Sequence, residues 1–314
     1  MARLRRIDNV VQTRLDWRDA FTQFLEYKRV GGISSQTQSD YERTVDLLFK
    51  RFPGAWATDT ALKEAAYAHL AQEGIAPATF NNRLVYLRTF FKWCEENGII
   101  GANPLANVKK RKAESRIVAV EKDILTALLN APDQSTFVGL RDYALILLTL
   151  DTGIRPKEAH TLIPVDFNAG AREIYISAKN AKTRVSRTLP VSDVTVKAIR
   201  RLIAVRPSEW GANVPIFCTY EGRPLNRNTW GDRMEYYSGL VGQHIRPYDL
   251  RHVFALEFLR HGASAFAVQR TLGHTTMEMT KTYIALANDD LKVAHAQSSP
   301  LTSLISDKKR VGRV

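Results

Sequence analysis

The regular spacing of apolar residues along this chain breaks off between Asn103 and Val118. The run Lys109-Lys110-Arg111-Lys112 lies in this interval, and because like charges repel one another, such a run favours an extended linker. At 314 residues the chain is long enough for two domains, since one domain usually takes roughly 100 to 200 residues. The sequence therefore predicts an N-terminal extension over 1–15, a helical domain over 16–105, a basic linker over 106–117, a second domain over 118–300 and a C-terminal tail over 301–314.

The region before the linker has the apolar spacing of amphipathic helices. Gly31 and Gly32 end a first helix, and the serines at 34 and 35 are suited to cap a second. The last helix, from about 78 to 97, has apolar residues at steps of three and four, as one buried helix face requires. Those positions are Phe80, Leu84, Leu87, Phe91 and Cys94. Arg83, Arg88 and Lys92 lie between them and predict a basic outer face, although an ordinary solvated face has the same pattern.

The charge balance of the chain favours a polyanionic partner such as nucleic acid. Its 45 Lys and Arg residues outnumber its 32 Asp and Glu residues, which gives a formal net charge of +13. Ribosomal, membrane-surface and polyphosphate-binding proteins share such a balance, so the charge alone does not choose among them. With 45% hydrophobic and 25% charged residues, the composition is that of a globular protein and not of a disordered or collagen-like chain.

The sequence indicates no membrane segment, disulfide framework or metal site. Its longest apolar run, over 143–150, is far shorter than the roughly 20 residues that a membrane helix needs, and the basic N-terminus is not followed by a hydrophobic signal core. We therefore expect a cytoplasmic protein with no membrane partner. Cys94 and Cys218 lie far apart, with no Cys/His cluster and no H-E-x-x-H motif, so we expect two core thiols, no metal ion and no cofactor.

The region after the linker mixes helical patterns with one alternating segment. Residues 173–177 and 184–189 alternate around Asn180-Ala181, which predicts a β-hairpin. Helical patterns occupy about 123–130, 139–150, 156–162, 191–205 and the region from 248 onward. The predicted fold class is mainly α with a small antiparallel β-sheet, in which a helical first domain is followed by a mixed α/β second domain.

Three short motifs of the second domain carry basic and proton-carrying side chains. Thr152-Gly-Ile-Arg-Pro-Lys-Glu158 interrupts an apolar helix and restarts it, which places Arg155 at a helix N-terminus. Anions are favoured there, and a guanidinium can bind phosphate through two hydrogen bonds. Taken alone, a surface arginine paired with Glu158 explains this motif equally well. Tyr248-Asp-Leu-Arg251-His-Val-Phe-Ala and Leu272-Gly-His274 follow, and Tyr283 comes after them.

Taken together, these motifs resemble those of the tyrosine recombinase, or phage integrase, family. The matching pieces are T-G-x-R-x-x-E at 152–158, a hairpin lysine at Lys179, D-L-R-H-x-F-A at 249–255, L-G-H at 272–274, and a tyrosine nine residues after His274. The helical first domain is similar to the family's core-binding, SAM-like domain, so the resemblance covers nearly the whole chain and implies that the second domain is catalytic. The N-terminal extension is too short for the arm-binding domain of larger phage integrases, so the architecture resembles that of Xer-like members.

The resemblance implies that Tyr283 is the nucleophile of DNA cleavage and forms a 3′-phosphotyrosyl bond. Arg155 and Arg251 would clamp the scissile phosphate, and His274 would donate a hydrogen bond to it. These residue types suit the reaction, because breaking a phosphodiester without a metal needs a nucleophile and fixed cations that neutralise charge on the nonbridging oxygens.

The departing 5′ oxygen also needs a proton. The resemblance assigns this role to Lys179, since nearby arginines lower the pKa of a lysine toward a useful range. Lys182 is a rival on the same turn. Glu158 is expected to orient Arg155 and to take no part in proton transfer.

The chain departs from the family pattern at Tyr248. The family usually has histidine three positions before the second arginine, and a phenol with a pKa of about 10 carries protons poorly near neutrality. Tyr248 can still donate a hydrogen bond to a phosphate oxygen, so we include it among the catalytic candidates. His244 and His252 lie close enough in sequence to compensate, and we interpret His252, beside Arg251, as structural.

The resemblance implies a site-specific DNA recombinase, or integrase, that exchanges strands of double-stranded DNA through a Holliday junction. It also implies a homo-tetramer on two DNA sites, assisted in some members by an accessory DNA-bending or directionality protein. A type IB topoisomerase and a catalytically silent DNA-binding protein remain alternatives, and only Tyr248 points toward the silent one. The candidate DNA-binding residues are Arg83, Arg88, Lys92, Lys109, Lys110, Arg111, Lys112 and Lys182.

Overall fold

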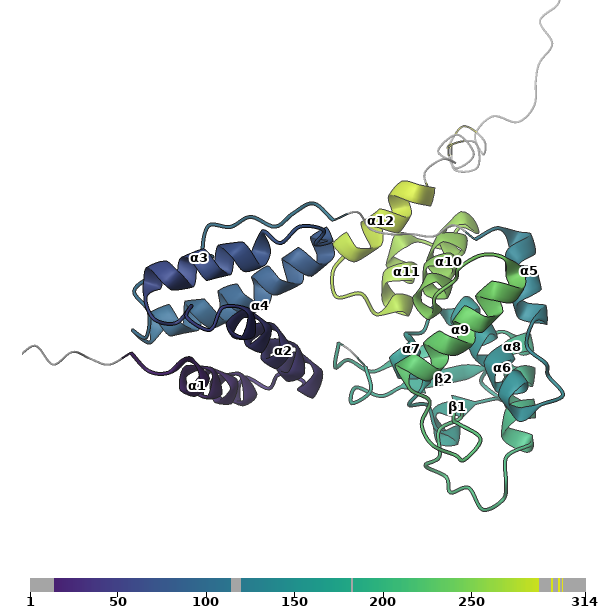
Figure 1. The fold of residues 1–314 in the computed structure, drawn as a ribbon. Coiled ribbons are helices and arrows are strands. Elements are labelled where there is room, and N and C mark those ends of the chain that lie inside the picture. Colours follow the sequence, from purple (N-terminus) through teal and green to yellow (C-terminus); the bar gives the residue numbers. More distant parts are fainter. Residues whose placement is uncertain are drawn as a thin grey trace, which may run out of the picture. The chain divides into compact units, whose positions relative to one another are not determined.

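The computed structural model describes residues 14–113, 120–181 and 183–287, together with residues 295, 299 and 301 (Figure 1). The chain forms two compact units, Met1–Glu114 and Ser115–Val314. The described parts are mainly helical and contain one small antiparallel sheet, which confirms the predicted fold class. No helix within these described ranges is long and apolar enough to cross a membrane.

The described part of the first unit is made of helices joined by short loops. They are α1 (Trp17–Val30), α2 (Ser35–Arg51), α3 (Asp59–Leu70) and α4 (Pro77–Glu96). Asp16, Ser34 and Thr58 cap the first three, each accepting a hydrogen bond from a main-chain N–H of the first turn. The apolar face of α4 is buried as predicted, and the core around it is rich in aromatic rings in edge-to-face contact.

The segment that follows α4 is bonded to the first unit as far as Arg111. Asn81 exchanges two hydrogen bonds of 2.9 Å with the main chain of Arg111. The Arg111 guanidinium lies 4.0 Å from the ring centroid of Phe80, a cation–π contact. Side chains of α4 therefore hold the main chain of this segment at residue 111. Residues 114–119 lie outside the described ranges.

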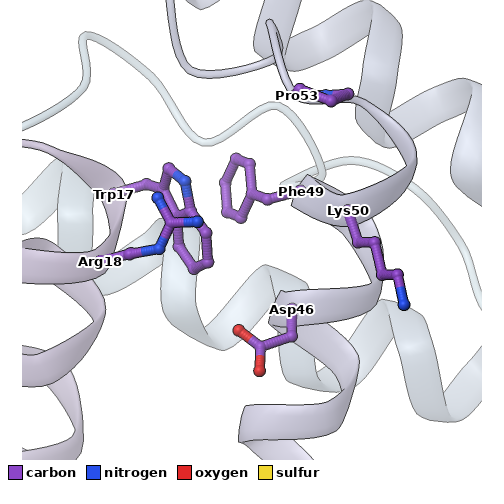
Figure 2. A pocket seen from close by; sticks show the side chains of 6 residues that line it. All are labelled: Trp17, Arg18, Asp46, Phe49, Lys50 and Pro53. Carbon is purple, nitrogen blue, oxygen red and sulfur yellow. The ribbon is translucent and has the colours of Figure 1, made fainter.

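A pocket of about 570 Å³ opens between the start of α1 and the end of α2 in the first unit. In Figure 2 the guanidinium of Arg18 lies across the Trp17 indole, 4.5 Å from its centroid, and the indole stacks on Phe49 at 4.4 Å. The remaining lining residues are Asp46, Lys50 and Pro53. The stacked rings fix the start of α1 against α2.

The second unit packs helices around a three-stranded sheet of order β1-β2-β3. Both strand pairs are antiparallel, and Ile174 of β2 faces Leu189 of β3 in the core. The elements are α5 (Lys122–Asn130), α6 (Phe137–Thr152), α7 (Pro156–Ala159), η1 (Pro164–Asp166), β1 (Phe167–Asn168), β2 (Glu173–Ile176), β3 (Arg187–Pro190), α8 (Asp193–Ala204), α9 (Arg227–Val241), α10 (Pro247–Arg260), α11 (Ala265–Leu272) and α12 (Glu278–Ala287).

Three of these elements, η1, β1 and α9, go beyond the sequence prediction. β1 is only two residues long, too short for an alternating pattern. α9 buries Trp230, Met234 and Tyr237 at helical spacing, but Gly231 and Gly239 within it weaken the helical signal. The predicted hairpin is present with shorter strands, and the helix expected over 156–162 ends at residue 159.

A buried carboxylate ties α6 to α9. Asp142 is fully buried and accepts hydrogen bonds from Arg141 at 2.7 Å, from Arg233 at 2.7 Å and from the Tyr237 hydroxyl at 2.8 Å. A buried charge is tolerated only when it is paired and hydrogen-bonded, and Asp142 meets both conditions. The cluster therefore fixes α6 and α9 to each other, and α10 packs against both.

Candidate active site

The C-terminal end of α11 collects three arginines from separate elements. The carbonyl of Thr271 accepts from Nε of Arg187 at 3.2 Å, that of Leu272 from Nη2 of Arg251 at 2.8 Å, and that of Gly273 from Nη2 of Arg155 at 3.0 Å. The last carbonyls of a helix lack partners within the helix and carry partial negative charge, so cations are stabilised there. Residues far apart in sequence are thereby brought to one point beside α10, α11 and α12, which lie together in Figure 1.

Glu158 bridges two of these arginines. Its Oε1 lies 3.1 Å from Nη1 of Arg155, and its Oε2 lies 2.6 Å from Nη2 of Arg187. Burial alone would raise the pKa of Glu158, but the hydrogen bond and charge of Arg187, and then those of Arg155, hold the pKa below its ordinary value. The predicted pairing of Glu158 with Arg155 is present, and Arg187 is a second partner that the sequence analysis missed.

Arg251 is fully buried, and its contacts are main-chain carbonyls. Besides Leu272, its Nη1 donates to the carbonyl of Gly153 at 2.5 Å. Burial, followed by the charge of Arg155, lowers the pKa of Arg251 to about 10. Gly153 ends α6 in the left-handed region with φ of +61°, where glycine is favoured, and this turn aims its carbonyl at Arg251.

His274 and Tyr283 complete the cluster. Their rings lie nearly parallel with centroids 6.3 Å apart, and Nδ1 of His274 lies 3.0 Å from the Thr280 hydroxyl oxygen. Burial, then the charges of nearby arginines, lowers the pKa of His274 to about 4. Tyr283 on α12 is 5% exposed, and burial raises the pKa of its phenol to about 12.

The phenol oxygen of Tyr283 lies 2.7 Å from Nδ1 of His252 on α10. The sequence did not predict this contact between His252, interpreted there as structural, and the candidate nucleophile. His244 takes no part in the contact: it is half-exposed and lies 2.8 Å from Glu235. The sequence shows that His252 and Tyr248 are four residues apart and therefore lie on one face of a helix. It does not show that α12 packs against this face.

Tyr248 lies at the edge of the cluster. It is 44% exposed, its ring packs edge-on against His252 with centroids 5.0 Å apart, and the Arg251 guanidinium lies 5.8 Å from its centroid. Lys179 is exposed in the turn between β2 and β3, and within the described ranges no hydrogen bond or ion pair joins it to the cluster. Arg187, the first residue of β3, anchors the hairpin to Glu158, while Lys182 lies outside the described residues.

Some candidate DNA-binding side chains of the first unit are engaged by other groups of the protein, and others are exposed. Arg88 donates to the carbonyls of Leu105, at 2.9 Å, and Val108, so its side chain holds the segment after α4. Arg83 donates to Gln72 at 3.2 Å. Lys92 is exposed and 3.5 Å from a Glu96 carboxylate oxygen. The exposed basic residues of the following segment are Lys109, Lys110, Arg111 and Lys112.

Comparison with known proteins places this geometry in a family. Residues 119–289, more than half of the chain, match the family model described as "Phage integrase family", and the chain therefore belongs to this family. It is 29% identical over 286 residues to Tyrosine recombinase XerD of Xanthomonas campestris pv. campestris, covering 86% of this chain and 88% of that protein. It is 28% identical over 291 residues to Tyrosine recombinase XerC of Pelobacter propionicus, covering 90% and 94%.

Solved structures have the same fold. The Tn1549 transposon integrase in complex with a circular intermediate DNA matches with a TM-score of 0.72 at 20% identity, over 89% of this chain and 98% of that one. A lambda integrase dimer bound to a core site matches with a TM-score of 0.67 at 16% identity, over 84% and 97%. These likenesses extend across both units of the chain and establish the fold of each.

Proposed function

We propose that this chain is a site-specific tyrosine recombinase, which cleaves and rejoins duplex DNA through a 3′-phosphotyrosyl intermediate. The observation that carries the proposal is the meeting of Arg155, Arg251 and His274 with the buried hydroxyl of Tyr283 at the end of α11. The similarity to Tyrosine recombinases XerD and XerC over most of the chain supports it.

In this proposal the arginines hold the scissile phosphate. Arg155 donates to Glu158 and Gly273, and Arg251 donates to Gly153 and Leu272. Their planar guanidiniums are therefore fixed before DNA binds. Fixed donors stabilise developing charge without reorganising, and each is worth on the order of 3 kcal/mol in the transition state. Glu158 forms ion pairs with Arg155 and Arg187 and thereby keeps the guanidinium of Arg155 in place.

His274 acts as a neutral donor to the same phosphate. With a pKa of about 4 its ring is uncharged near neutrality. In this proposal the Thr280 hydroxyl donates to Nδ1, 3.0 Å away, and the ring proton on Nε2 is donated to a phosphate oxygen. The neutral imidazole thereby donates a hydrogen bond to the phosphate that Arg155 and Arg251 also bind.

Lys179 supplies the proton that the departing 5′ oxygen needs, and Lys182 is its rival. The hairpin that carries Lys179 is tied at its other end to Glu158 through Arg187. The start of β3 is therefore fixed to the cluster, and in this proposal the lysine reaches the scissile bond when DNA is bound. Replacing Lys179 or Lys182 singly by methionine distinguishes the two. Only the loss of the lysine that protonates the 5′ oxygen should slow DNA cleavage.

The proposed partner is double-stranded DNA, bound by both units. The net charge of +13 and the exposed lysines at 92, 109, 110 and 112 suit a phosphate backbone. As the family resemblance implies, a homo-tetramer would bind two sites and pass through a Holliday junction, with or without an accessory DNA-bending or directionality protein. Such an enzyme would act on DNA in the cytoplasm.

Covalent trapping tests this function. The protein is incubated with nicked duplexes that carry a randomised core, denatured in SDS, and the attached DNA is sequenced. We expect an adduct that is absent from Tyr283→Phe. Recombinant product from two copies of the recovered site supports a recombinase, whereas relaxation of supercoils without recombinant product supports a type IB topoisomerase. Tight binding without any adduct supports a catalytically silent DNA-binding protein.

A further inference from the structure

The hydroxyl of Tyr283 has one hydrogen-bond partner within the described ranges, and that partner is His252. Nδ1 of the imidazole lies 2.7 Å from the phenol oxygen, and the two ring centroids are 5.6 Å apart. His252 lies on α10 directly after Arg251, while Tyr283 comes from α12, so the contact joins two packed helices. It therefore places a ring nitrogen of His252 within hydrogen-bond distance of the proposed attacking atom.

Both groups are neutral near pH 7, so the tautomer of His252 sets the direction of this hydrogen bond. Burial raises the pKa of Tyr283 to about 12, so the phenol keeps its proton near neutrality. Burial also lowers the pKa of His252, so its imidazole is uncharged. With the ring proton of His252 on Nε2, the phenol donates to the lone pair of Nδ1.

We propose that His252 accepts the phenol proton when Tyr283 attacks the scissile phosphate, an inference that rests on the proposed recombinase function. As the bond between the phenol oxygen and phosphorus forms, the proton moves to Nδ1 of His252. The bond from phosphorus to the 5′ oxygen breaks, and that oxygen takes a proton from Lys179. Religation reverses both transfers, so each residue returns to its starting state.

Tyr248 accounts for the need for such a base. It occupies the position where the family usually has histidine, and a phenol cannot accept a proton near neutrality. Tyr248 and His252 are four residues apart and lie on one face of α10. The edge-on packing of their rings, with an interplanar angle of 70°, holds the imidazole toward Tyr283. Tyr248 is thus a positioning residue for His252.

The neighbouring ring is not placed for this task. His274 stacks on Tyr283, but its Nδ1 is engaged by the Thr280 hydroxyl at 3.0 Å. We therefore assign the two histidines different tasks. His274 donates to the phosphate, and His252 accepts the proton of the Tyr283 phenol.

The charges around His252 indicate that the pKa of its imidazole rises when DNA binds. After burial, Asp249 raises its pKa, whereas Arg251 and Arg246 lower it. Tyr248, Tyr283 and His274 are the other titratable groups that face this region, and burial keeps both Tyr283 and His274 uncharged near neutrality. A bound phosphate neutralises part of the positive charge of the arginines, so the imidazole should become a better proton acceptor in the complex.

The test is the pH dependence of single-turnover cleavage, measured on nicked duplexes that carry the site recovered by trapping. His252→Asn keeps a polar atom near the position of Nδ1 but cannot take up a proton. His261→Asn changes an exposed histidine at the end of the same helix and is the matched control. At pH 7 we expect His252→Asn to cleave about 100-fold more slowly than the wild type. We expect His261→Asn to cleave at the wild-type rate.

The pH profiles separate proton acceptance from positioning. The wild-type rate should rise through the acidic range and level off once His252 is neutral, whereas the His252→Asn rate should keep rising tenfold per pH unit as hydroxide replaces the base. A His252→Asn variant with the wild-type rate and profile would overturn the inference. If that variant fails to fold, as judged by loss of DNA binding, the wild-type profile decides alone: a rate that climbs without levelling off contradicts a base at His252.

These results are distinct from a failure of the proposed function. If the wild type forms no covalent adduct, the recombinase proposal fails. If the wild type forms the adduct and His252→Asn matches it, only the role of His252 fails. Religation of purified adduct gives a second readout, because the same proton must return from His252, and we expect the variant to slow it by about the same factor.

Discussion

Gly153→Ala should destabilise the second unit by an amount that the structure allows us to calculate in two parts. Gly153 ends α6 with φ of +61°, a conformation that costs an L-residue about 1–2 kcal/mol. A Cβ there would also lie 2.4 Å from Cδ1 of Phe254 and 2.6 Å from Cδ2 of Leu272. Forcing such contacts in a packed core costs about 1–3 kcal/mol. The expected total loss is therefore on the order of 2–5 kcal/mol.

Gly242→Ala is the matched control for this prediction. Gly242 ends α9 with φ of +74°, but a Cβ built on it meets nothing within 4 Å. It should lose only the backbone part, about 1–2 kcal/mol. Urea-dependent hydrogen exchange of α6 and α10 amides, read by mass spectrometry, measures the free energy of unfolding of this unit. Equal losses in the two variants would refute the clash with Phe254 and Leu272.

The same substitution should affect the active site. The carbonyl of Gly153 accepts a hydrogen bond from Arg251, so displacing this turn should also slow DNA cleavage. Gly242 is on a different helix end, and Gly242→Ala should cleave at close to the wild-type rate. A Gly153→Ala protein that is less stable yet fully active would show that the turn does not position Arg251.

Three further predictions concern single side chains. Arg155→Lys loses the planar guanidinium that bonds Gly273 and Glu158, and we expect about 3 kcal/mol less transition-state stabilisation, seen as roughly two orders of magnitude in single-turnover cleavage rate. Glu158→Gln should cost on the order of 3 kcal/mol at neutral pH. Because the folded pKa of Glu158 lies below 4.5, its charge stabilises the fold above that pH, so the difference in thermal unfolding between variant and wild type should shrink as the pH falls through the folded pKa. Burial raises the pKa of Cys94 to about 12, so native protein at pH 8 should resist iodoacetamide at Cys94, and peptide mass analysis should find alkylation only after denaturation.

Local sequence patterns predicted the helices and motifs of this chain but not the contacts between distant elements. The apolar face of α4, the break after α6 and the hairpin follow from periodicity and turn residues. The bonds from Arg187 to Glu158 and from His252 to Tyr283 depend on how α10, α11 and α12 pack, and no local pattern specifies that packing. The same reason applies to Arg88, whose spacing suggests a basic surface, although its guanidinium is engaged by main-chain carbonyls.

The proposed function requires that Tyr283 forms the covalent bond to DNA, and mass spectrometry of the adduct can identify the attached residue. The trapped adduct is digested with nuclease and trypsin, and the peptides are sequenced by fragmentation. Cleavage after Lys281 and Lys292 releases the peptide 282–292, which contains Tyr283 as its only tyrosine. The account predicts a nucleotide remnant on Tyr283 in this peptide. A remnant on any other residue, Tyr248 included, would contradict it.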